Sequence, residues 1–305
     1  MNSDFFLVES SDQDVRIDKL LADRFHPHFS RTYFAALIKE GLILVNSQPI
    51  KKREKFKEGD VVEICFAHRP ETDLQPENIP LEVVYEDKDL LVINKPCGMV
   101  VHPAPGNWTG TFVNALLYHC KELKEVSDTL RPGIVHRLDK ETTGLLVAAK
   151  NLEAQKRLIE AFSGRKVYKE YFALTYGRPK EGRLETLIGR DPKNRQKMAV
   201  LEEGGKTAIS HIEVLASKKE LSLVKIIIET GRTHQIRVHL KYLKTPILGD
   251  TVYGSSSVNE KYRADRLFLH AWKLKLPHPF TGKLLETTAP IPQEFFILSD
   301  IPYSG

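Results

Sequence analysis

The sequence predicts an α+β protein in which a small N-terminal domain precedes a larger domain built on a largely antiparallel mixed sheet. Strand patterns are frequent along the chain and helical patterns are few, which favours antiparallel pairing over alternating parallel units. The length of 305 residues suits one small and one large domain. A proline-containing polar stretch separates the two parts. We therefore place the small domain at 15–67, a linker at 68–80 and the large domain at 81–305.

The composition indicates an ordinary globular protein with a mild basic excess. Hydrophobic residues make up 41% and charged residues 28%, so disorder is not expected. The net charge of +5 is uneven: residues 31–57 hold seven Lys or Arg against two Glu, and residues 162–200 hold ten against four Asp or Glu. Two basic tracts in a nearly balanced chain favour a nucleic-acid partner, with solvated surface as the alternative.

Cysteine content and hydropathy indicate a cytoplasmic protein. Cys65, Cys97 and Cys120 form an odd set without CxxC spacing, which argues against a disulfide framework and against a zinc knuckle. No segment approaches the length of an apolar membrane span. The first fourteen residues are acidic and lack the apolar core of a signal peptide.

The small domain begins with two predicted helices. Apolar residues at i, i+3, i+4 and i+8 predict an amphipathic helix over 17–25, which Pro27 ends. Ser30 is the expected N-cap of a second helix, and Gly41 its C-terminal stop. Short strands follow at 43–45 and 61–66, the first of them leading into a turn at Asn46-Ser47.

The large domain should alternate short strands with a few helices. Asn151 and Gly164 are the expected cap and stop of one helix, and Thr233 is the expected cap of another. Strands are predicted at 81–85, 90–93, 145–149, 167–176 and 221–230, a further helix at 112–120, an exposed loop at 255–266 and a final hairpin at 267–282.

A dense polar loop near the middle of the chain leads into a buried strand. Residues 131–144 gather cations and carboxylates immediately before the apolar run 145–149. Asp139 lies between Arg137 and Lys140, which favours its charged form. Such a loop can hold a reactive side chain on a rigid support, although a solvated turn would have the same composition.

The strand at 167–176 places an aromatic residue on a polar face. Side chains alternate along a strand, so Tyr171 shares its face with Lys169 and points away from Phe172 and Leu174. The ring could therefore meet a ligand. The alternative is an aromatic side chain that shields the sheet.

Motifs in collinear order resemble a known family. His136-Arg-Leu-Asp139 followed by Thr142-Thr-Gly144 is similar to the signature of the RluA family of RNA pseudouridine synthases, and residues 15–66 resemble an S4 RNA-binding domain. The resemblance covers roughly residues 15–295 and is strongest to the large-subunit rRNA pseudouridine synthase D group. Further matching blocks are Asn94-Lys-Pro, His102-Pro, Lys169-Glu-Tyr, Gly231-Arg-Thr-His-Gln-Ile-Arg-Val-His and Pro246-Ile-Leu-Gly-Asp.

The resemblance implies roles for particular residues. Asp139 matches the invariant catalytic aspartate, Arg237 its ion-pair partner, and Tyr171 the ring that stacks on the flipped uracil. Arg137 would occupy the position that the flipped nucleotide vacates. The residues expected to bind RNA or assist base flipping are Arg137, His136, Arg31, Lys51, Lys52, Arg53 and Arg232.

The implied reaction requires neither a metal ion nor a cofactor. Pseudouridine forms when the N1–C1′ bond breaks, the uracil turns over and C5 joins C1′, so we expect no metal and no cofactor. Asp139 could attack C1′, attack C6 or remove the C2′ proton, and the sequence leaves these routes open. We expect a monomer that acts on ribosomal RNA or on a pre-50S particle and that has no membrane partner.

Two other classes of function remain as alternatives. One is a non-catalytic RNA-binding factor for ribosome assembly, in which Asp139 could be replaced without loss. The other is a metal-dependent hydrolase that uses His136, His234 and His239. Their spacing argues against it, because His234 and His239 would lie about 140° apart on a helix of 3.6 residues per turn.

Overall fold

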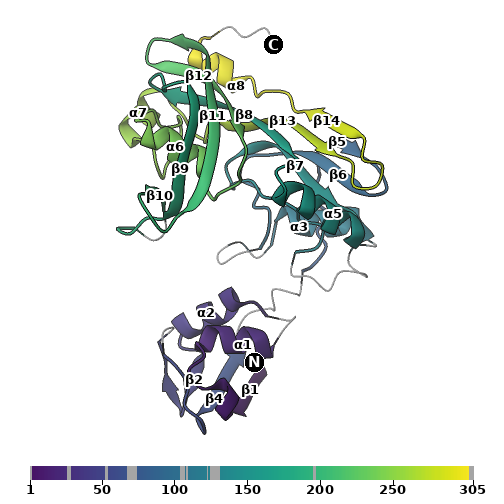
Figure 1. Cartoon of the computed structure of the whole chain (residues 1–305), viewed down its shortest axis with the longest axis vertical. Coiled ribbons are helices and arrows are strands. Elements are labelled where there is room, and N and C mark those ends of the chain that lie inside the picture. The colour runs from purple at the N-terminus through teal and green to yellow at the C-terminus, as the bar shows by residue number, and fades with distance from the viewer. Residues whose placement is uncertain are drawn as a thin grey trace. The chain divides into compact units, whose positions relative to one another are not determined.

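The computed structural model describes residues 2–25, 29–51, 54–66, 74–103, 107, 109–121, 123, 131–194 and 197–301. The chain forms two compact units, drawn in Figure 1. One contains Met1–Ile79 and His102–Pro132, and the other contains Pro80–Val101 and Gly133–Gly305. Within the described part of the chain, no helix combines the length and the apolar character that crossing a membrane requires.

The N-terminal unit packs two helices on a four-stranded antiparallel sheet. The sheet order is β1-β4-β2-β3, with β1 Asn2–Leu7, β4 Val61–Phe66, β2 Ile43–Val45 and β3 Gln48–Pro49. The helices are α1 Ile17–Arg24 and α2 Arg31–Lys39, preceded by the short 3-10 helix η1 Ser10–Asp12. The hydroxyl of Ser30 accepts a hydrogen bond from the N–H of Tyr33 at 3.2 Å, which confirms the predicted cap. Strand β1 was not predicted.

The N-terminal unit also contains helix α3, Phe112–His119. Thr111 caps it, with its hydroxyl accepting from the N–H of Asn114 at 3.4 Å. The Asn114 amide donates to the carbonyl of Gln75 at 2.8 Å, which ties the helix to the chain that leaves the small sheet.

The larger unit is built on a ten-stranded sheet. It is mixed and largely antiparallel, as the sequence predicted. Its order is β10-β9-β11-β12-β8-β13-β7-β6-β5, with β14 paired to β13. Every pairing is antiparallel except that of β7 with β13. The strands are β5 Val83–Glu86, β6 Leu90–Lys95, β7 Thr143–Ala149, β8 Tyr168–Tyr176, β9 Gly182–Arg190, β10 Met198–Leu201, β11 Lys206–Lys218, β12 Leu221–Ile228, β13 Leu269–Pro277 and β14 Leu284–Thr288.

Short helices accompany this sheet. Helix α5, Leu152–Ser163, packs on β7 and starts at Asn151, whose side chain accepts from the N–H of Ala154 at 2.8 Å as predicted. Two expectations were wrong. The segment expected as a loop contains a helix, and Thr233 is not a cap, because His234 precedes the first helical residue in a left-handed conformation with φ of 57°. The other helices are α6 Gln235–Tyr242, α7 Ser256–Lys261 and α8 Glu294–Ser299.

Strand register brings distant polar residues to one place in the sheet. Thr143 at the start of β7 pairs with His270, and His270 also pairs with Phe172 of β8. Tyr171, which precedes Phe172 in β8, pairs with Ile226 of β12. The loop before β7, the middle of β8 and the end of β12 therefore converge. The parallel pairing requires Gly144, because a Cβ there would lie 2.2 Å from the carbonyl oxygen of Ala271.

Candidate active site

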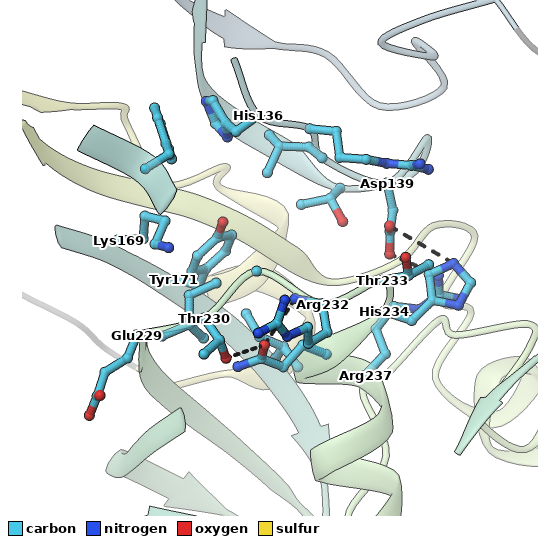
Figure 2. A pocket seen from close by; sticks show the side chains of 18 of the residues that line it. His136, Asp139, Lys169, Tyr171, Glu229, Thr230, Arg232, Thr233, His234 and Arg237 are labelled. Atoms are coloured by element: carbon cyan, nitrogen blue, oxygen red, sulfur yellow. Dashed lines mark hydrogen bonds and ion pairs between the residues drawn. The ribbon is translucent and has the colours of Figure 1, made fainter. Parts of the chain in front are cut away.

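A pocket of about 390 Å³ opens where these segments converge in the larger unit. Its walls are the loop before β7, the C-terminal end of α5, the first half of β8 and the turn between β12 and α6. Figure 2 shows Asp139 beside His234 and Arg237, and Lys169 beside Tyr171. The pocket thus gathers most of the residues that the sequence singled out in the larger domain.

The loop that carries Asp139 is anchored by a buried lysine. The ammonium of Lys95, which is fully buried, donates to the carbonyls of Pro96 at 2.8 Å, Met99 at 3.0 Å and Lys140 at 2.9 Å. Burial lowers the pKa of Lys95 to about 8, although interactions with Cys97, Glu141 and Asp139 act in the opposite direction and raise it. Because Lys140 directly follows Asp139, this lysine helps to fix the position of the carboxylate.

Asp139 is paired with Arg237 inside the pocket. Nη1 of Arg237 donates to Asp139 Oδ2 at 3.0 Å, and the Asp139 side chain keeps 18% of its surface exposed. A charge-assisted hydrogen bond of this kind fixes the carboxylate and leaves its second oxygen available. The structure therefore brings together the aspartate and the arginine that the resemblance paired.

A second, deeper carboxylate holds Arg237 in place. Asp250 has a fully buried side chain and accepts from Nε at 2.8 Å and from Nη2 at 2.9 Å. Burial raises the pKa of Asp250, but hydrogen bonds from Arg237 and from the backbone outweigh it, so the pKa lies below its ordinary value. Burial lowers the pKa of Arg237, and the two carboxylates raise it above its ordinary value.

His234 faces Asp139 and is held by Tyr253. The N–H of Met198 donates to the Tyr253 hydroxyl at 2.9 Å, and that hydroxyl lies 2.8 Å from Nδ1 of His234. When the Tyr253 hydroxyl donates its proton to Nδ1, the proton of a neutral imidazole lies on Nε2. Nε2 lies 3.9 Å from Asp139 Oδ1. Burial lowers the pKa of His234 and outweighs the charge of Asp139, which raises it. The lowered pKa favours the neutral ring.

Tyr171 lies in the wall of the pocket with 7% of its surface exposed. Burial, and then the charge of Asp139, raises the pKa of its hydroxyl above the ordinary value. A phenol in this state is protonated at neutral pH, so it can donate a hydrogen bond or stack but is a poor base. Lys169 lines the same pocket, which matches the strand parity expected from the sequence.

His136 is held within the loop before β7. Its Nε2 accepts from the N–H of Val147 at 2.9 Å, so Nδ1 carries the proton. The ring stacks on Phe162, with centroids 4.5 Å apart. Burial and the charge of Lys169 lower the pKa of His136, which keeps it neutral. Arg137 is exposed at the pocket rim.

The turn before α6 is shaped by a buried glutamine. Gln235 Oε1 accepts from the Thr230 hydroxyl at 2.7 Å and from the N–H of Arg232 at 3.1 Å. Nε of Arg232 donates to the carbonyl of Thr207 at 2.8 Å. These contacts place Arg232 in the pocket wall beside His234. Arg232 is one of the residues that the sequence predicted to bind RNA.

The remaining predicted RNA-binding residues belong to the N-terminal unit. Arg31 donates to buried Asp18 at 2.9 and 3.3 Å while half of its side chain stays exposed, so its role is partly structural. Lys51 is exposed. Lys52 and Arg53 lie outside the described residues.

Some residues of the site had no predicted role. Asp250, Tyr253 and Lys95 all fall in or beside blocks that resemble the family, which was the available signal, but no local pattern shows which group each one holds. Within the described residues, His136, His234 and His239 belong to no cluster of three side chains able to share a metal ion.

Comparison with known proteins matches both parts of the chain to known families. Residues 15–62 match the S4 domain, and residues 89–242 match the family described as RNA pseudouridylate synthase. The protein is therefore an RNA-modifying enzyme carrying an S4 module.

The relatives agree with this class. A protein of Neisseria meningitidis serogroup B named "Ribosomal large subunit pseudouridine synthase D" is 44% identical, over 94% of this chain and 78% of its own length. An uncharacterized RNA pseudouridine synthase of Aquifex aeolicus is also 44% identical, over 95% and 94%. The solved structure of human RNA pseudouridylate synthase domain containing 4 superposes with a TM-score of 0.57 and 30% identity, over 72% of this chain and 91% of its own. The chain belongs to the RNA pseudouridylate synthase family and is an RNA pseudouridine synthase.

Proposed function

We propose that this protein converts specific uridines of large-subunit ribosomal RNA into pseudouridine, with Asp139 as the catalytic carboxylate. The observation that carries the proposal is the ion pair of Asp139 with Arg237 in a pocket that Tyr171 also lines. The names of the relatives support ribosomal RNA as the substrate. We further propose that the enzyme acts as a monomer in the cytoplasm, on the free RNA or on a pre-50S particle.

The domain boundaries belong to the same proposal. An RNA-binding domain at 15–67 and a catalytic domain at 81–305, joined by 68–80, would divide substrate capture from chemistry. Exposed Lys51 and half-exposed Arg31 suit contact with phosphates, because a basic face with few aromatic rings favours backbone recognition.

The reaction begins with a uridine turned out of its stack, because a stacked base cannot reach a buried carboxylate. Arg137, exposed at the rim, would fill the vacated space in the RNA. One oxygen of Asp139 stays bound to Arg237, and the other faces the nucleotide. That oxygen attacks C1′, attacks C6 or takes the C2′ proton.

The bond changes balance without an added reactant. The N1–C1′ bond breaks and its electron pair stays on uracil, which turns over against the Tyr171 ring. C5 then forms the bond to C1′ and loses its proton, while N1 ends protonated. Arg237 and the neutral Nε2–H of His234 would stabilise the negative charge that develops beside Asp139.

The loss of the C5 proton supplies a direct assay. Large-subunit ribosomal RNA carrying [5-³H]uridine should release tritium to water when incubated with the wild-type protein. Asp139→Asn should reduce release to background and keep the RNA dissociation constant within a few-fold. Glu153→Gln, an exposed carboxylate on α5, serves as the matched control and should react like wild type.

Two outcomes would contradict the proposal. Release by Asp139→Asn within a few-fold of wild type would remove this residue from the chemistry. Tight RNA binding by the wild-type protein without any tritium release would favour the non-catalytic assembly factor instead.

A further inference from the structure

Lys169 is a nearly buried cation for which the described residues supply no hydrogen-bond or ion-pair partner. It keeps 7% of its surface exposed and lines the pocket from strand β8. Among the residues that the structure describes, no hydrogen bond or ion pair holds its ammonium. Burying a charge without compensation costs free energy, so a protein that retains one usually has a use for it.

The charges around Lys169 are mostly of the same sign. Arg165, after helix α5, and Arg232, after strand β12, both line the pocket and oppose protonation of the lysine. The carboxylate of Glu229 lines the same wall but already binds Nε2 of His211 at 2.7 Å. His136 and Tyr171, which line the same pocket, are both neutral at pH 7. Asp139, another carboxylate of the pocket, is paired with Arg237. This end of the pocket therefore carries net positive charge and is suited to bind an anion.

We propose that Lys169, together with Arg165 and Arg232, binds a phosphodiester group of the RNA next to the flipped nucleotide. The inference rests on the proposed function, because it takes RNA as the substrate. Lys169 stands two residues before Tyr171 on one strand face, roughly 7 Å along the strand, a separation that one nucleotide can bridge. An ammonium and guanidinium groups are the side chains that proteins use for phosphate.

The first test measures how RNA binding depends on salt. Lys169→Met keeps the length of the side chain and removes its charge, Lys169→Arg keeps the charge, and exposed Lys180→Met is the matched control. All three are made in the Asp139→Asn protein so that the RNA stays unmodified. The probe is a protein-free transcript of large-subunit ribosomal RNA, titrated at several salt concentrations.

Lys169→Met should weaken binding by about tenfold at low salt, the effect of losing one charge-assisted hydrogen bond. It should also reduce the slope of log Kd against log salt by roughly 0.7, the value for one contact to single-stranded phosphate. Lys169→Arg should restore the slope, and Lys180→Met should not change it. An unchanged slope in Lys169→Met overturns the proposal, including when binding weakens, because an uncharged contact such as a uracil carbonyl releases no counterion.

The protonation of Lys169 gives a second test. Burial, and then Arg165 and Arg232, lower its pKa to about 8. A phosphate favours the charged form, so binding should weaken as pH rises above about 8 in the parent protein but not in Lys169→Met. The difference between the two proteins cancels the contribution of Lys95, which titrates in the same range. Parallel pH profiles would count against the phosphate contact.

Stability separates this role from a structural one. Because no described residue pairs with the ammonium, Lys169→Met should unfold at the same or a higher temperature than its parent. Removal of a structural lysine would instead lower the melting temperature. Tritium release by the protein with Asp139 intact reports on the proposed function independently. If the protein with Asp139 intact releases tritium but Lys169→Met leaves the salt slope unchanged, only the phosphate subsite is rejected. If Lys169→Met reduces the salt slope but the protein with Asp139 intact releases no tritium, only the proposed catalysis is rejected.

Discussion

Asp250 binds Arg237 through Nε and Nη2 and thereby leaves Nη1 directed at Asp139. The two aspartates have different surroundings. Asp250 is fully buried and has its oxygens satisfied by Arg237 and backbone N–H groups, whereas Asp139 opens into the pocket. One carboxylate positions the arginine, and the arginine positions the other carboxylate.

Asp250→Asn should therefore damage both stability and catalysis. The substitution removes the carboxylate that holds Nε and Nη2 of Arg237 and leaves Asp139 as its remaining ion-pair partner. Breaking a buried ion pair typically costs about 3–5 kcal/mol. We expect a loss of this order in the free energy of unfolding, measured with urea, and a fall in kcat for tritium release. Glu286→Gln, which removes an exposed partner of Lys275, should change neither quantity. A stable, fully active Asp250→Asn protein would refute the positioning role.

Tyr253→Phe should remove the hydrogen bond that holds His234. The substitution removes the acceptor for the N–H of Met198 and the donor to Nδ1 of His234. An unsatisfied buried group costs about 1–3 kcal/mol, so the free energy of unfolding should fall by that order. The imidazole could then place its proton on Nδ1, and we expect kcat to fall more than KM rises. Equal kcat values for Tyr253→Phe and wild type would exclude a role for the Nε2–H of His234.

Two buried histidines should make the larger unit sensitive to acid. His239 and His270 are each 1% exposed, and burial lowers the pKa of each to about 4. The unfolded chain binds these protons near pH 6.5, so stability is complete above that pH and falls between about pH 6.5 and pH 4. Each histidine should contribute a slope of about 1.4 kcal/mol per pH unit.

Urea unfolding at several pH values checks this prediction. His239→Gln should lower the slope of the free energy of unfolding against pH by about 1.4 kcal/mol per pH unit on the acid side. Equal slopes for His239→Gln and wild type would show that this histidine binds its proton equally in the folded and unfolded states, and would contradict the prediction.

The basic face of the N-terminal unit should bind RNA through charge. Lys51→Gln, at an exposed position, should lower the salt slope of RNA binding by roughly 0.7 without affecting stability. Arg31→Gln should lower both the salt slope of RNA binding and the stability, because Arg31 also neutralises buried Asp18. Burial raises the pKa of Asp18, and Arg31 with Arg16 brings it below the ordinary value. Lys19→Gln, exposed on α1, is the control. Unchanged salt slopes in both variants would place the RNA elsewhere.

The sequence by itself determined the class of fold and the central residue of the site. Strand alternation placed Tyr171 and Lys169 on one face, and the polar run before β7 singled out Asp139. These features are local, because side-chain periodicity depends only on neighbours along the chain. Helix starts were less secure: Asn151 is a cap as predicted, but the cap predicted at Thr233 failed when buried Gln235 bound the turn and His234 took the left-handed conformation.

Only the tertiary structure decided which charges are paired. Asp139 and Arg237 are 98 residues apart, and their contact depends on the order β12-β8-β13-β7 and on the register of each pair. The fold also gave Arg237 its second partner in Asp250, and among the described residues it supplied no partner for Lys169. Compensation of a buried charge is a property of three-dimensional neighbours, so it cannot be read from residues that are adjacent only in sequence.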